Sequence, residues 1–129
     1  MTTLAATLGE LTAILQSHPL CERTVILETR EFSPNQFYFK VRTELPHGYQ
    51  FQTRVYSNFG HVDYAFQLFK KGAPLLRWDN KEEFRTLKTY PHHHHDDRGN
   101  IQPSPLTGDP QADIVFVLRQ IENFLADIA

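Results

Sequence analysis

Apolar and polar residues alternate with a period of two through the middle of this 129-residue chain, and this pattern constrains its fold most. Bulky apolar side chains take every second position in residues 37–42 and 62–68, and in residues 51–56 Phe51 and Val55 alternate with Gln52, Arg54 and Tyr56. Because successive side chains of a β-strand point to opposite faces, the pattern predicts strands with one buried face. A β-branched run at residues 24–28 and an apolar run at residues 75–79 predict two more strands.

Short turns separate the five predicted strands. They contain the segments Ser33-Pro34-Asn35, Pro46-His47-Gly48, Asn58-Phe59-Gly60 and Lys70-Lys71-Gly72. Connections this short join antiparallel neighbours, since a parallel crossover needs a dozen or more residues. We therefore expect a five-stranded antiparallel meander.

The two ends of the chain have helical periodicity instead. Apolar residues recur three and four positions apart at Leu4, Leu8, Leu11 and Leu15, and again at Ile114, Leu118, Ile121, Leu125 and Ile128. Thr2 or Thr3 can cap the first helix, whereas Asp109 followed by Pro110 suits the start of the last.

Two amphipathic helices can cover the apolar face of a meander. The expected fold class is α+β, one two-layer domain over residues 1–129, with an N-terminal and a C-terminal helix packed on five strands. Residues 81–88 are expected to form one or two helical turns. Residues 89–110, with four prolines, are expected to form a histidine-rich loop.

Composition excludes several classes of protein. The formal net charge of −2 excludes a globally basic nucleic-acid binder, and a single cysteine excludes an intrachain disulfide framework. No stretch has the length and apolarity of a membrane span, and the first residues lack the pattern of a secretory signal. The expectation is a cytoplasmic protein without a membrane partner.

The charge is unevenly distributed. Residues 37–88 hold nine Lys and Arg against five Asp and Glu, whereas residues 89–129 hold two against six. Strand alternation sends four candidate substrate-binding residues to the face opposite the phenylalanines: Lys40, Arg42, Arg54 and Tyr56. Guanidinium groups beside a tyrosine suit phosphate and base contacts. The other interpretation is the polar surface that any solvated sheet face needs.

Four consecutive histidines, His92 to His95, form the strongest local signal. One interpretation is a metal site, because alternate imidazoles share a side and Asp96 or Asp97 follows. Another is acid–base catalysis on RNA without a metal, because histidine exchanges protons near neutrality. The third is a polar loop that hydrogen-bonds to the sheet. The residues alone leave all three open.

Two motifs together resemble a known family. Arg77-Trp78-Asp79-Asn80 matches a pattern R-[YW]-D-N, and Pro91 to His95 matches P-H-H-x-H, with His94 at the variable position. The pair, over roughly residues 24–125, resembles the TumE-type toxins of toxin–antitoxin systems. The resemblance implies a cytoplasmic toxin neutralised by a cognate antitoxin. In family members the Asp-Asn of the first motif is often followed by Ala-Pro-His. This chain reads Asp79-Asn80-Lys81-Glu82-Glu83, so the histidine of that pattern is missing.

The leading hypothesis is a toxin that acts as a metal-independent endoribonuclease with no cofactor. His92 and His95 are the candidate acid and base, with His93 as an orienting or substitute group. Arg77 would stabilise the charged phosphorane, and Asp79 would fix Arg77 or an imidazole. The substrate-binding residues named above would hold the RNA backbone.

Two other functions stay open: a non-catalytic binding or regulatory module, and a metal-dependent nuclease that uses the histidines. A homodimer through exposed strand edges is a further expectation.

Overall fold

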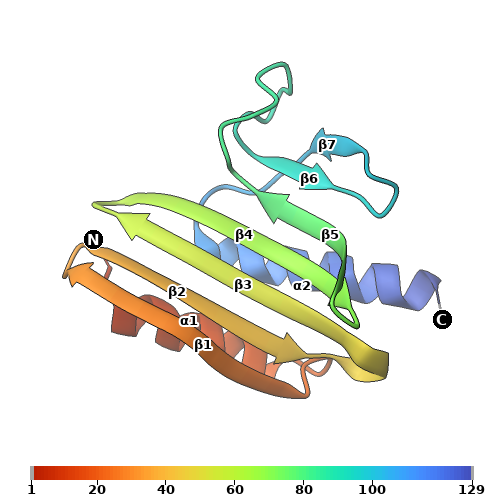
Figure 1. Cartoon of the computed structure of the whole chain (residues 1–129), viewed down its shortest axis with the longest axis horizontal. Coiled ribbons are helices and arrows are strands. Elements are labelled where there is room, and N and C mark those ends of the chain that lie inside the picture. Colours follow the sequence, from red (N-terminus) through yellow and green to blue (C-terminus); the bar gives the residue numbers. More distant parts are fainter. Residues whose placement is uncertain (1, 129) are drawn as a thin grey trace.

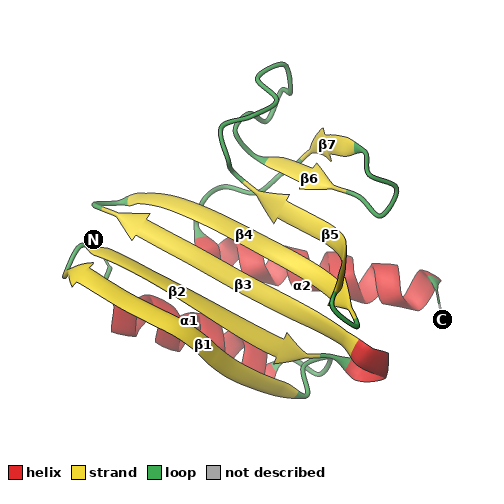
Figure 2. Ribbon diagram, viewed as in Figure 1, coloured by secondary structure: helices red, strands yellow, loops and turns green. Residues whose placement is uncertain are grey.

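The computed structural model describes residues 2–128. Figure 1 shows two helices behind one sheet, and Figure 2 shows the same elements by type. In chain order the elements are α1 (Leu4–Ser17), β1 (Arg23–Ser33), β2 (Gln36–Glu44), the 3₁₀ turn η1 (Pro46–Gly48), β3 (Tyr49–Asn58), β4 (His61–Lys70), β5 (Ala73–Asp79), β6 (His93–His95), β7 (Ile101–Pro103) and α2 (Pro110–Asp127).

The sheet is an antiparallel meander in which strand order follows chain order from β1 to β7. All five predicted strands form, and the α+β class with a helix at each end is confirmed. The number of strands was wrong, because the sheet has seven. The extra two strands, β6 and β7, lie within the predicted loop and add to the free edge of β5.

The helical turns expected at residues 81–88 are also wrong, since this segment contains only turns and bends. Phe84 has a φ of +54°, in the left-handed region that an α-helix of L-residues does not use. Its ring packs instead with its edge against the imidazole of His93, with the ring centroids 4.9 Å apart. A tertiary contact thus replaces local helix formation.

The core lies between the sheet and both helices. Phe37, Phe39, Phe51 and Phe66 are fully buried on one face of the sheet, in one cluster with Leu11 of α1 and with apolar residues of α2. The expected caps are present: Thr3 accepts a hydrogen bond from the Ala6 N–H, and Asp109 accepts one from the Gln111 N–H. Among the described helices, none has the length and apolarity to cross a membrane.

Because both helices pack on one face, the opposite face of the sheet carries no helix (Figure 1). We call it the open face. In β2 every second residue is buried, and the residues between them are half-buried. Burial alternates less regularly along β3, β4 and β5, but the strand register places Arg54, Asp63 and Arg77 on the open face, where the candidate site lies.

Candidate active site

Strand register lines up side chains across the open face. One such row runs from Lys40 through Arg54, Ala65 and Asp79 to His93. The neighbouring row brings Arg77 of β5 opposite His95 of β6. Arg77, Asp79, His93 and His95 therefore meet at one place on adjacent strands. We call them the Asp79 cluster.

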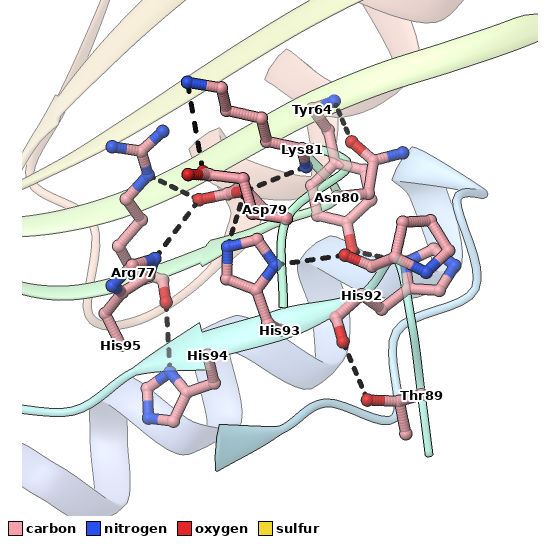
Figure 3. Close-up of polar contacts among 12 residues, drawn as sticks. Tyr64, Arg77, Asp79, Asn80, Lys81, Thr89, His92, His93, His94 and His95 are labelled. Atoms are coloured by element: carbon pink, nitrogen blue, oxygen red, sulfur yellow. Dashed lines mark hydrogen bonds and ion pairs between the residues drawn. The ribbon is translucent and has the colours of Figure 1, made fainter. Parts of the chain in front are cut away.

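Asp79 is the centre of this cluster (Figure 3). Its carboxylate is almost fully buried, and Arg77 Nε lies 2.6 Å from Oδ2 while His93 Nε2 lies 2.9 Å from Oδ1. The backbone N–H of Lys81 also donates to Oδ1, at 3.0 Å. A carboxylate buried away from water needs such partners, and here a guanidinium, an imidazole and a backbone N–H surround Asp79 beneath the open face.

His93 has an acceptor oxygen beside each ring nitrogen. Nδ1 lies 3.0 Å from the carbonyl oxygen of Pro91, and Nε2 lies beside Asp79 at close range but without the alignment of a hydrogen bond. With Nδ1–H donating to Pro91, a neutral ring presents the lone pair of Nε2 to a carboxylate. A proton or another cation between the two atoms removes that repulsion. His93 is 1% exposed, so it acts on solutes only through its neighbours.

His95 is the accessible histidine of the cluster, with 32% of its side chain exposed. Its Nε2 lies 3.7 Å from Asp79 Oδ2, an ion-pair contact longer than a hydrogen bond. Desolvation lowers the pKa of His95, although the charge of Asp79 opposes this. The neutral ring, which can accept a proton, is therefore the favoured form at neutral pH.

His92 and His94 lie outside the Asp79 cluster: in Figure 3 His94 points away from His93 and His95, and His92 lies beside Tyr64. The hydroxyl of Tyr64 lies 2.8 Å from His92 Nδ1. Burial raises the pKa of Tyr64, so the phenol keeps its proton, and when the His92 proton is on Nε2 the phenol donates to Nδ1. His94 stacks on Trp78, with centroids 4.5 Å apart, and Nδ1 donates to the Arg77 carbonyl oxygen at 3.1 Å. The structure therefore does not bring His92 together with His95.

A cavity of about 430 Å³ adjoins the Asp79 cluster on the open face. Arg77 and Asp79 belong to both, and the wall also includes Tyr38, Arg54, Tyr56 and Lys81. Two of the predicted substrate-binding residues, Arg54 and Tyr56, thus line the cavity. The other two, Lys40 and Arg42, share the open face but lie outside the wall, and Arg42 donates to Gln52.

A family model described as Toxin TumE matches residues 11–128, nearly the whole chain. This chain belongs to the TumE toxin family. Searches of curated proteins and of solved structures find no match.

The two TumE-like motifs form one pair of strands. Arg77 and Asp79 come from β5, and they face His95 and His93 of β6 in register. His94, at the variable position of the second motif, is the residue of β6 that points away from the open face. Asn80 follows β5 and completes the edge of β4, because its side chain accepts from the Tyr64 N–H and donates to the Val62 carbonyl oxygen.

Asp79, His93 and His95 can also hold a metal ion. One ligand atom from each residue lies within 4.8 Å of the other two. His93 has the orientation common in metal sites, where the second ring nitrogen donates to a backbone carbonyl. Asp96, an acidic ligand that the sequence suggested, instead accepts hydrogen bonds from Arg98, Asn100 and Gln102 in the turn before β7.

Sequence reasoning missed three residues of the site. Phe84 covers the cluster, with its ring edge-on to His93 and to His95. Tyr38 and Lys81 line the cavity. Tyr38 carried a usable signal, since it alternates with Phe37 and Phe39 on the same strand as Lys40. Phe84 and Lys81 lie in an irregular segment, where the periodicity of the sequence does not indicate the direction in which a side chain points.

Proposed function

We propose that this TumE-family toxin is an endoribonuclease that cleaves RNA through its own 2′-hydroxyl without a metal. One observation carries the proposal: an accessible histidine, His95, stands beside a buried carboxylate and a guanidinium. This set can supply a base, an orienting group and a cation. The chain would act as one domain in the cytoplasm, where its RNA substrate occurs.

The proposed reaction uses each group once. The charge of Asp79, 3.7 Å from Nε2, favours the His95 tautomer with its proton on Nε2, which leaves the lone pair of Nδ1 to take the proton of the 2′-hydroxyl. The 2′-oxygen then bonds to phosphorus, and the bond from phosphorus to the 5′-oxygen breaks. Arg77 stabilises the negative charge that develops on the phosphoryl oxygens. The products are a 2′,3′-cyclic phosphate and a 5′-hydroxyl.

The leaving 5′-oxygen must gain a proton. The candidate donor is the ammonium group of Lys81, which lines the cavity beside the cluster and exchanges protons with solvent. His92 was the other candidate in the sequence, but its Nδ1 accepts from Tyr64 on the helix side of the sheet. His93 serves as a positioning residue that holds Asp79, since it is buried and paired with it.

The test is incubation of the purified chain with RNA in excess chelator. Cleavage that leaves 2′,3′-cyclic phosphate ends supports the proposal, because transesterification through the 2′-hydroxyl produces these ends. An oligonucleotide with a single ribose serves as a control, since cleavage must then occur only after that ribose. Absence of cleavage of any nucleic acid would instead support a non-catalytic binding or regulatory module.

A metal-dependent nuclease is the second candidate, and the geometry of Asp79, His93 and His95 favours it specifically. A divalent cation between His93 Nε2 and Asp79 would remove the repulsion between their lone pairs. The same assay separates the two candidates: cleavage lost in chelator and restored by Mn²⁺ or Zn²⁺ supports the metal-dependent enzyme.

Membership of a toxin family implies an antitoxin partner. We expect the antitoxin to cover the open face or the β6–β7 turn, with acidic side chains that compete with RNA for Arg54 and Arg77. Hydrogen exchange on the toxin with and without antitoxin tests this, and full exchange of both surfaces in the complex contradicts it. A homodimer is also expected, because β1 lies at the edge of the sheet and can pair with a second copy. Sedimentation of the purified chain tests this.

A further inference from the structure

The cavity beside the Asp79 cluster has the dimensions of a ligand site. Its volume of about 430 Å³ falls within the roughly 300–1,000 Å³ of small-molecule pockets. The row across the open face explains the hollow: between Arg54 and Asp79 stands only the methyl group of Ala65. A longer side chain at this position would fill the space above the sheet.

Two tyrosines form one wall of the cavity. Tyr38 of β2 lies directly opposite Tyr56 of β3 in the strand register. The Tyr56 hydroxyl accepts a hydrogen bond from Gln36 Nε2 at 2.7 Å, and the Tyr38 hydroxyl contacts Glu28. Each ring is thus held at its hydroxyl end and half-buried. Fixed aromatic faces of this kind are platforms for nucleobases, since every base has a π-face.

A cation stands between these rings and the reactive groups. Within residues 2–128, no carboxylate lies within 4.0 Å of the Arg54 guanidinium. Two of the three acidic groups of the cavity wall have other partners: Asp79 contacts Arg77, and Asp63 contacts His61 at 3.2 Å. The third, Glu82, is exposed and lies more than 4.0 Å from the guanidinium. Arg54 is therefore free to pair with an anion that enters.

We infer that this cavity binds one unstacked base of single-stranded RNA, with Tyr56 and Tyr38 against the base and Arg54 on its phosphate. The inference rests on the proposed function, because the base would belong to a nucleotide next to the phosphate that the Asp79 cluster cleaves. A base in a duplex is stacked and paired, so it cannot enter a cavity at the surface of a sheet. The inferred substrate class is thus single-stranded RNA.

Binding can be measured separately from cleavage. The probe is a short, fluorescent, mixed-sequence 2′-O-methyl oligoribonucleotide, which has no 2′-hydroxyl to react, used alone and annealed to its complement. Fluorescence anisotropy should show that the single strand binds at least about tenfold more tightly than the duplex. Tyr56→Ala should weaken single-strand binding by roughly tenfold or more. Tyr56→Phe keeps the aromatic face but loses the hydrogen bond from Gln36, so it should retain most of the affinity that Tyr56→Ala loses.

Arg54→Gln should weaken binding and lower the salt dependence of the binding constant by about one phosphate contact. Arg119→Gln is the matched control. It makes the same change at an exposed position on α2, in the other layer, and should leave both quantities unchanged.

Two results would overturn the inference: equal affinity for single strand and duplex, or wild-type affinity in a folded Tyr56→Ala variant. Its failure is distinguishable from failure of the proposed function. If the probe binds as described but unmodified RNA stays intact, the inferred base site is supported and the proposed nuclease activity is wrong. If RNA is cleaved and Tyr56→Ala leaves KM unchanged, the proposed nuclease activity is supported and the inferred base site is wrong.

Discussion

Two pairs of histidines alternate along one short segment and have opposite surroundings. His93 and His95 face the open side of the sheet and lie beside the carboxylate of Asp79. His92 and His94 face the helix side, where one accepts from Tyr64 and the other stacks on Trp78. The four residues are identical in the sequence, so their chemistry differs only because a strand sends neighbours to opposite faces.

If the proposed function is correct, this difference separates a pair that contains the reacting histidine from a pair that contributes only to stability. The open-face pair adjoins a cavity and a guanidinium, which are what a reaction on RNA needs. The helix-side pair contributes hydrogen bonds and stacking that attach β6 to the rest of the sheet. Substitutions within each pair should therefore affect different measurements.

The largest expected effect is on the cleavage rate of His95→Ala. Loss of a general base costs about 10²–10⁴-fold in rate, so cleavage of RNA in chelator should fall at least a hundredfold. The unfolding free energy should change little, because the ring is partly exposed. His94→Ala is the matched variant, and it should keep the rate within about threefold while unfolding more easily. Equal rates in the two variants would contradict the assignment.

Asp79→Asn should affect both rate and stability. The amide keeps the shape of the side chain but leaves Arg77 and His93 beside a neutral group. Removing one partner from a fully buried ion pair costs roughly 3–5 kcal/mol. The Arg77 side chain is 35% exposed, so the unfolding free energy should fall by less than this amount. The cleavage rate of the folded fraction should fall about tenfold or more, since His95 loses its orienting charge. A variant as stable as the wild type would show that the cluster is not a buried ion pair.

The helix-side pair should make stability depend on pH. Desolvation lowers the pKa of His94 and of His92 below the ordinary value of 6.5. The unfolded chain therefore binds protons that the folded chain does not, and the unfolding free energy should fall as the pH drops below 6.5.

Denaturant unfolding in chelator at pH 7.5 and pH 5.5 measures this loss. His94→Phe keeps a ring on Trp78 but cannot titrate, so its loss between the two pH values should be smaller. A loss as large as that of the wild type would contradict the role of His94.

The smallest expected effect belongs to Tyr64→Phe. This change removes one hydroxyl and leaves His92 Nδ1 without its donor. One hydrogen bond contributes about 1 kcal/mol, so the unfolding free energy should fall by that order. A decrease as large as that of Asp79→Asn would mean that the helix-side pair matters as much to stability as the Asp79 cluster.

The fold could be predicted where each element carries its own signal. Alternation identified β2, β3 and β4, a β-branched run identified β1, and an apolar run identified β5. Apolar residues at helical spacing, together with Asp109-Pro110, identified the helices. β6 and β7 have three residues each and no apolar alternation. They are strands only because the edge of β5 offers unpaired backbone groups, and this is a property of the tertiary structure.

The sequence indicated most residues of the candidate site but not how they are arranged in space. The motifs indicated Arg77, Asp79 and the histidines, and alternation showed that His93 and His95 share a side. The segment was expected to be a loop, so nothing in the sequence excluded His92. The position of Phe84 over the imidazoles depends on a left-handed backbone conformation. Phenylalanine rarely adopts this conformation, so the sequence does not predict it.

Growth after induced expression tests the central claim most directly, namely that the open-face histidines carry the toxicity. The comparison is between His95→Asn and His94→Asn, each brought to the same level of soluble protein as the wild type. The account predicts normal growth with His95→Asn and arrested growth with His94→Asn. Arrested growth with His95→Asn at this protein level would contradict it.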